Sequence, residues 1–197
     1  VDIAESHAIC RYLAKIYPEA QKFYPSDDPM LCAQVDAKND FITFSIAGPF
    51  FNWFVVSAYF PKAWKLKIEK EAHHYHLCSV LLSKMWLPRL VNGSRMEPFL
   101  LGKEPFLPDF QLFYTLELSK MFSELFEIPE MHLFRDDPAL QTFYDAMCER
   151  PSTREILAAK ESELDVTKKE LFGGFGAAYL NKHIDRKIIG GLFGREI

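Results

Sequence analysis

Apolar residues recur at helical spacing through most of this chain, and few stretches alternate at the period of two that marks a half-buried strand. Gly48-Pro49 interrupts the second helical pattern, and we expect a break or kink there because proline lacks the N–H that a helix interior needs. The spacing excludes a sheet built from these residues alone and predicts an all-α fold. The expected helices span about residues 5–17, 28–47, 62–87, 108–126, 137–149 and 152–163.

The composition limits the classes of protein to which the chain can belong. Its 197 residues are 49% hydrophobic, which suffices for one large or two modest cores. A formal net charge of -4 argues against a nucleic-acid binder. No signal-peptide pattern and no long apolar span occur, so we expect neither secretion nor a transmembrane segment. Cys10, Cys32, Cys78 and Cys148 lack CxxC spacing and are expected to be free, mostly buried thiols in the cytoplasm.

The stretch from Glu5 to Ala14 begins a helix in a way that favours an anion site. Ser6 is a good N-cap residue, and apolar residues at helical spacing follow it immediately. The first N–H groups of such a helix attract an anion, and the Ser6 hydroxyl adds a donor. Glu5 places a carboxylate beside them, so the pair suits a small zwitterion such as an amino-acid head group. The alternative is a plain capped helix without a ligand.

Four motifs, in this order, resemble those of the cytosolic glutathione transferases. Glu5-Ser6-x-Ala8-Ile9-x-Arg11-Tyr12-Leu13 resembles the segment that closes the family's thioredoxin-like half. Val35-Asp36-Ala37-Lys38-Asn39-Asp40 resembles the start of the long interface helix, with features of the Pi and Sigma classes. Phe99-Leu100-Leu101-Gly102 through Pro108-Asp109-Phe110 resembles the family's folding motif, and Pro138-Ala139-Leu140 with Arg150-Pro151 resembles the end of its helical domain. Together the motifs cover about residues 5–160.

The resemblance implies the family's C-terminal helical bundle, preceded by the last helix of a thioredoxin-like α/β domain. Residues 1–24 would then be the tail end of that domain and a linker, residues 25–164 the helical domain, and residues 165–197 an extension. The chain opens at Val1 inside what resembles a strand end, so we expect most of the thioredoxin-like half upstream of it. In the family that half carries the residue that activates the thiol, so no catalytic residue is assigned here.

The resemblance also implies roles for individual residues. Ser6 and the helix N–H groups would hold the γ-glutamyl carboxylate of glutathione, and Glu5 would bind its ammonium group. Asp40 resembles the acidic residue that reaches glutathione on the other subunit, and its alternative is a solvated carboxylate. Asp36 is expected to be structural. The protein would be a homodimer that uses glutathione as co-substrate against apolar electrophiles.

A second function class stays open, namely a non-catalytic relative that serves as a binding or assembly module. The gamma subunit of the translation elongation complex is a module of this kind. The Glu5-Ser6 pair favours a ligand-binding member, because a pure scaffold has no need of it.

The third motif departs from the family pattern, which has Ser or Thr where this chain has Phe106. We expect Asp109 to accept a hydrogen bond from a backbone N–H, as the third residue of a capping box does. The lost hydroxyl should cost about 1 kcal/mol. Pro108 suits the first helical turn and offsets part of that cost.

A dense aromatic group lies where the family's helices wall the site for the apolar co-substrate and form the dimer face. The alternative is ordinary hydrophobic core, and we expect the core to include most of the group. Its members are Phe41, Phe44, Phe50, Phe51, Trp53, Phe54, Tyr59 and Phe60.

Two later stretches invite functional interpretations. His73-His74-x-His76 places two histidines on one helix face but lacks a third ligand nearby, so we expect solvated or capping histidines and no metal. The extension has a glycine-rich apolar stretch, 171–180, and apolar residues at helical spacing over 180–188. It could form a helix packed on the domain, a lid, a tail that binds a partner, or a segment on a membrane surface.

Overall fold

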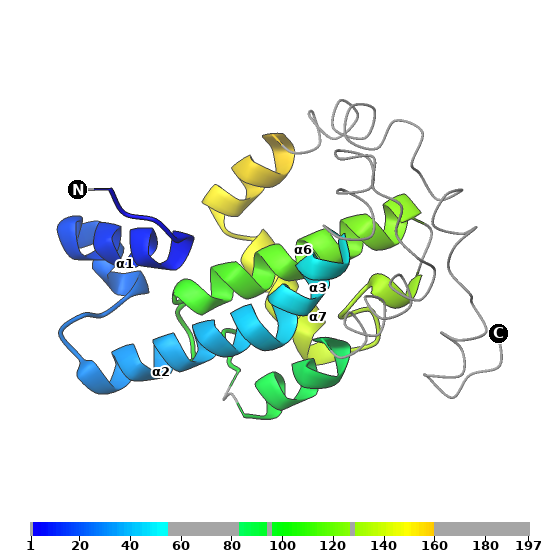
Figure 1. The fold of residues 1–197 in the computed structure, drawn as a ribbon, viewed down its shortest axis with the longest axis horizontal. Helices are drawn as coiled ribbons and strands as arrows, with labels where there is room; N and C mark the ends of the chain where they lie inside the picture. The colour runs from blue at the N-terminus through cyan, green and yellow to red at the C-terminus, as the bar shows by residue number, and fades with distance from the viewer. Residues whose placement is uncertain (1, 55–82, 94–95, 127–128, 160–197) are drawn as a thin grey trace.

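The structure is a computed structural model that describes residues 2–54, 83–93, 96–126 and 129–159 (Figure 1). Every regular element in these ranges is helical, and Phe99 and Gly102 form an isolated β-bridge. This confirms the all-α prediction for the described residues. Two further helices span 83–92 and 151–159. The named elements are α1 (Ser6–Ile16), η1 (Pro18–Phe23), α2 (Pro29–Phe41), η2 (Ile42–Ala47), α3 (Gly48–Phe54), α6 (Leu107–Phe126), η4 (Pro129–Met131) and α7 (Pro138–Cys148).

Helix α6 lies at the centre of the main hydrophobic core. It runs beside the rod formed by α2, η2 and α3, and α7 packs against it (Figure 1). Apolar residues three and four apart give α6 a continuous buried face, as the helical period requires. The fully buried members of this core include Ile42, Ile46, Phe50, Leu112, Leu116, Phe143 and Met147.

Asp-Pro pairs begin two of these helices. The Asp28 carboxylate accepts hydrogen bonds from the N–H groups of Met30 and Leu31, and Pro29 occupies the first turn. Asp137 caps α7 in the same way, with Pro138 following it. In each pair the aspartate accepts from N–H groups that have no intrahelical acceptor. Proline has no N–H, so its position requires no acceptor.

At Gly48-Pro49, where the sequence predicts a break or kink, the chain forms a wide helical turn. Residues Ile42–Ala47 form a π-helix, in which the Gly48 N–H bonds to the carbonyl of Thr43, five residues earlier. The wider register accommodates Pro49, which has no N–H to donate. A Cβ atom at Gly48 would lie 2.8 Å from the Thr43 carbonyl oxygen, so glycine is required at this close approach. The chain therefore stays helical into α3.

Other boundaries differ only slightly from those expected. The described part of the helix predicted over 62–87 covers residues 83–92 and so ends five residues later than expected. The turn expected at 91–94 therefore begins at residue 93. The remainder of that helix, the histidines at 73–76, Tyr59, Phe60 and the extension 165–197 lie outside the described residues. Within the described ranges, no helix is long and apolar enough to cross a membrane. No cluster of metal-ligating side chains occurs in those same ranges.

A second, smaller core connects α1 to the bundle. It contains Ala14, Tyr24 and Val35, with Leu101 and Phe106 packed against it. This arrangement leaves much of α1 uncovered, and it makes one sequence prediction wrong. Cys10 on α1 is exposed, and Cys32 and Cys148 are only partly buried, so the described cysteines are not the buried thiols that we expected.

Candidate functional site

The N-terminus of α1 has N–H groups available for a ligand. The first intrahelical bond joins the Ile9 N–H to the Glu5 carbonyl, so the N–H groups of Ser6, His7 and Ala8 precede the helical ladder. In the described structure no side chain caps this end, whereas aspartates cap α2 and α7. Glu5 and Ser6 are both exposed. Ser6 is not the N-cap that the sequence predicts, because Glu5 occupies that position and Ser6 is the first residue of the helix. Both residues nevertheless lie beside open N–H groups at the positive end of a helix dipole.

Glu5 has a strained backbone. Its φ is 70° and its ψ is 121°, a conformation that residues with a Cβ rarely adopt. Such strain is typical of sites where the surrounding structure must aim a particular group. The sequence contained no signal of this conformation, because glutamate gives no preference for positive φ.

The apolar stripe of α1, formed by Ile9, Tyr12, Leu13 and Ile16, faces away from the bundle. All four side chains are exposed, although their spacing places them on one face of the helix. Ala14, on another face, is the buried residue of α1. The helix therefore attaches to the described bundle through its less apolar side.

Asp36 on α2 joins α1 to the bundle through two polar contacts. Its Oδ1 lies 3.4 Å from Nε of Arg11, and its Oδ2 accepts a hydrogen bond from the Tyr24 hydroxyl at 3.1 Å. Burial, followed by the hydrogen bond and negative charge of Asp36, raises the pKa of Tyr24 to about 12. The hydroxyl therefore remains a proton donor at neutral pH. These contacts are intramolecular, and the expectation that the role of Asp36 is structural stays a prediction.

Asp40 lies one helical turn beyond Asp36 and is exposed. Among the described residues, no hydrogen bond or ion pair joins it to Glu5 or Ser6. The single chain thus brings Glu5 and Ser6 together and leaves Asp40 apart from them. A contribution of Asp40 across a subunit interface stays a prediction.

An aromatic row, formed by Phe23, Phe110, Tyr114 and Phe51, follows one face of α6. Phe23 meets Phe110 edge-on with ring centroids 5.3 Å apart, and Phe51 stacks on Tyr114 at 6.2 Å. Phe110 and Tyr114 lie one turn apart on α6, and Tyr114 is exposed. Of these four residues, Phe51 belongs to the aromatic group predicted from the sequence, and Phe110 was named there only as part of the folding motif. The spacing of Phe110 and Tyr114 is a helical signal that could have identified the pair.

The other described aromatic residues between 41 and 54 divide between core and surface. Phe50 is fully buried, and Phe41 packs edge-on against Trp86 with centroids 5.9 Å apart. Phe44, by contrast, is 76% exposed. We expected the core to include most of this group. Phe50 lies in the core, Phe41 and Phe51 pack against it, and Phe44 lies on the surface, while the side chains of Trp53 and Phe54 are outside the described part of the structure.

Asp109 connects the start of α6 to the preceding loop. Its Oδ2 accepts from the Phe106 N–H at 2.8 Å, which confirms the predicted capping contact, and its Oδ1 accepts from the Leu100 N–H at 2.8 Å. The carboxyl group is fully buried. Burial raises its pKa to about 6, although both N–H donors oppose the shift.

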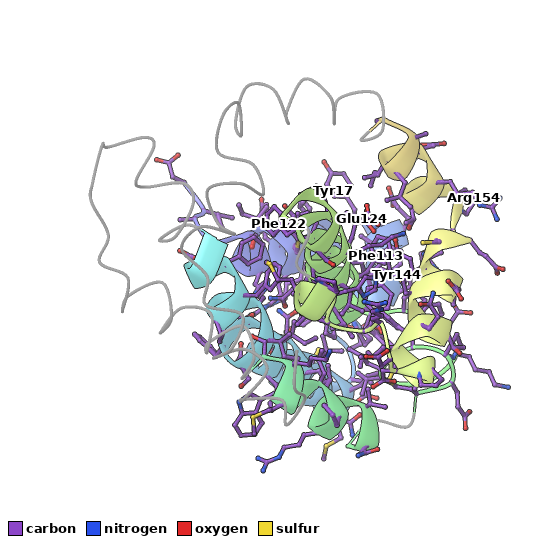
Figure 2. The ribbon with its side chains drawn as sticks, turned by 90° about the vertical axis from the view of Figure 1, so that its right-hand side faces the viewer. Tyr17, Phe113, Phe122, Glu124, Tyr144 and Arg154 are labelled. Carbon is purple, nitrogen blue, oxygen red and sulfur yellow. The ribbon has the colours of Figure 1, made fainter. Side chains whose placement is uncertain are left out.

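A second group of titratable side chains lies between α6 and α7. Tyr144 and Phe113, labelled in Figure 2, stack with ring centroids 5.3 Å apart. Tyr144 also donates a hydrogen bond to Glu117. Burial, reinforced by Glu117, raises the pKa of Tyr144. Burial likewise raises the pKa of Cys148, so its thiol stays protonated and unreactive at neutral pH. These residues hold two helices together and offer no activated nucleophile.

No protein-family model matches the chain, and no curated protein matches it. The resemblance to glutathione transferases therefore stays a prediction from the four motifs of the sequence.

Proposed function

We propose that the full-length protein is a glutathione transferase-like enzyme that joins glutathione to apolar electrophiles or uses it to reduce them in the cytoplasm. The observation that carries this proposal is the uncapped N-terminus of α1, where the strained Glu5 and the exposed Ser6 flank open N–H groups. This end offers donors for a carboxylate and, beside them, an acceptor for an ammonium group. The α-amino acid end of glutathione's γ-glutamyl group carries both charges.

The chemistry is attack by a thiolate on an electrophilic atom. The thioredoxin-like half would supply the group that lowers the thiol pKa from its usual value of about 8.5. The sulfur then forms a bond to the electrophile, and the leaving group departs with the bonding electrons. Ser6 and the α1 N–H groups hold the far end of glutathione and thereby fix the position of its sulfur.

The α1 stripe supports the expectation of a thioredoxin-like domain. A face of four large apolar side chains is stabilised only when another apolar surface covers it. We infer that the sheet of that domain packs on the stripe. The helix would then present its N-terminus at the boundary between the two domains.

The aromatic row is the surface that we assign to the apolar co-substrate. Its exposed member, Tyr114, stacks on Phe51, so two elements contribute to one apolar face. Phe23 extends this face toward α1, because η1 follows α1 directly in the chain. Aromatic side chains suit planar or aliphatic electrophiles without a strict requirement for shape.

We also propose a two-fold homodimer with α2 near the interface. Phe44 and Met85 are large apolar side chains left exposed on α2–η2 and on the 83–92 helix, and such surface favours association. Asp40 of one subunit would approach the Glu5–Ser6 site of the other, as two-fold symmetry allows. Sedimentation equilibrium should give a dimer. A monomer at micromolar concentration would remove both the dimer and the shared role of Asp40.

Calorimetric titration of glutathione into the full-length protein tests the proposed function. Ser6→Ala should weaken binding by about 1–3 kcal/mol, the usual contribution of a hydrogen bond to a charged group. Ser152→Ala is the matched control, because Ser152 is an exposed serine near the start of the 151–159 helix. Equal affinity of the wild type and Ser6→Ala would reject the assignment. No binding by the wild type would favour a non-catalytic assembly module.

A further inference from the structure

The ligand-binding end of α1 has a fixed position only if α1 itself is held against the bundle. The described contacts that hold it are few. Ala14 is its buried side chain, and the α1 stripe faces away from the bundle. The polar contacts to Asp36 therefore do much to fix the orientation of α1 relative to the bundle.

Asp36 is placed to control that angle. One carboxylate oxygen faces Arg11 on α1 at 3.4 Å, and the other accepts from Tyr24, which precedes α2. The facing atoms, Arg11 Nε and Asp36 Oδ1, are inaccessible to solvent although both side chains are partly exposed. Water therefore screens this pair less than it screens two freely exposed charges. A single side chain of α2 thus contacts both α1 and the connection that follows it.

The geometry also links Asp36 to the aromatic row. Tyr24 directly follows Phe23, and Phe23 packs on Phe110 of α6. Asp36 therefore contacts the body of α1, whose N-terminus carries the Glu5–Ser6 site, and also the residue that follows Phe23 of the row. A change in either contact would tilt one half of the proposed site against the other.

We propose that Asp36 is a positioning residue, which through Arg11 and Tyr24 sets the orientation of the glutathione-binding end of α1 relative to the aromatic row that receives the electrophile. This inference rests on the proposed function. Asp36 touches neither substrate in this account. Its loss should leave each half of the site intact while misaligning the sulfur and the electrophile, and small misalignments reduce rates strongly.

The first test separates binding from turnover in the full-length protein. Asp36→Ala should change the glutathione Kd by less than about threefold, because Ser6 and the α1 N–H groups remain, while kcat for conjugation should fall about 10- to 100-fold. Asp36→Asn keeps an acceptor for Tyr24 but loses the charge that faces Arg11, so its kcat should be intermediate. Asp36→Glu, which retains the charge and both oxygens, should recover most of the lost kcat.

The control variant is Asp27→Asn, which makes the same change in charge at an exposed position just before α2. Its kcat and Kd should equal those of the wild type. A merely structural Asp36 would lower thermal stability and the folded fraction but leave kcat per glutathione-binding site unchanged. That result would overturn the positioning role.

The second test does not depend on glutathione. Hydrogen exchange should become faster at the α1 amides of residues 9–16 in Asp36→Ala, while exchange in α7 stays as in the wild type. Unchanged protection of α1, in a protein that binds glutathione, would overturn the positioning role and leave the proposed function standing. If exchange in α1 becomes faster in Asp36→Ala but the wild type never binds glutathione, both the proposed function and the catalytic part of this inference would be overturned.

Discussion

Replacement of Asp109 by asparagine should change how the stability of this protein depends on pH. The two Asp109 oxygens accept from different backbone N–H groups, those of Leu100 and Phe106, each at 2.8 Å. Asparagine keeps only one accepting oxygen, so its NH₂ group must face one of these two donors. That N–H is left without an acceptor, which costs about 1–3 kcal/mol.

The pKa of Asp109 determines the sign of the pH dependence. Burial raises this pKa from 3.8 to about 6, so between these pH values the folded state binds more protons than the unfolded state. The protonated carboxyl group therefore adds to the free energy of unfolding, fully below pH 3.8, and this stabilisation is lost as the pH rises through about 6. The shift corresponds to about 3 kcal/mol. Asparagine does not titrate, so the wild type's advantage over Asp109→Asn should shrink by about that amount with rising pH.

Urea unfolding of both proteins, from about pH 3.5 to pH 7, measures this difference. Asp137→Asn is a matched control, because Oδ1 of Asp137 alone accepts both capping bonds and asparagine retains such an oxygen. Asparagine is as good an N-cap as aspartate, so the control should lose only a few tenths of a kcal/mol. An advantage of the wild type that grows with rising pH would refute the reasoning. The two N–H donors would then outweigh burial.

Three further predictions concern stability and are measured by thermal or urea unfolding. Phe50→Ala should destabilise the protein by about 3–5 kcal/mol because the side chain is fully buried, whereas Ile156→Ala, at a 68% exposed position of the 151–159 helix, should cost less than about 0.5 kcal/mol; equal losses would show that the described packing is wrong. Asp28→Ala should cost about 1 kcal/mol by removing the acceptor for the Met30 and Leu31 N–H groups, and an unchanged stability would contradict the cap. Gly48→Ala should be destabilising because its Cβ would lie 2.8 Å from the Thr43 carbonyl, and a neutral or stabilising effect would argue against the π-helix.

The helices were predictable because their apolar periodicity is a local property. Helix α6 and its buried face follow from residues spaced three and four apart, and the contact between Asp109 and Phe106 follows from the spacing of a capping box. The bond from Leu100 to Asp109 was not predictable, since it depends on how the preceding loop folds back. At Gly48-Pro49 the local rule predicted a break or kink but not the π-helix, which lets Ile46 and Phe50 both reach the core.

The candidate site was predictable in its residues but not in its geometry. Ser6 after Glu5, at the start of a helical pattern, indicated an anion site, and the structure places both residues at the α1 N-terminus. The positive φ of Glu5 and the contacts of Asp36 with Arg11 and Tyr24 depend on tertiary structure, which no local pattern encodes. The expectation of buried cysteines failed at Cys10 because α1 leaves most of its surface uncovered in the described structure.

If the N–H groups at the start of α1 bind glutathione, an NMR titration of the full-length protein should detect the contact at those groups. With ¹⁵N-labelled protein, the amide signals of Ser6, His7 and Ala8 should shift saturably as glutathione is added, while amides in α7 should not move. Ser6→Ala should require a higher glutathione concentration for the same shifts. Unmoved signals at Ser6, His7 and Ala8 under saturating glutathione, or shifts confined to other helices, would contradict the account.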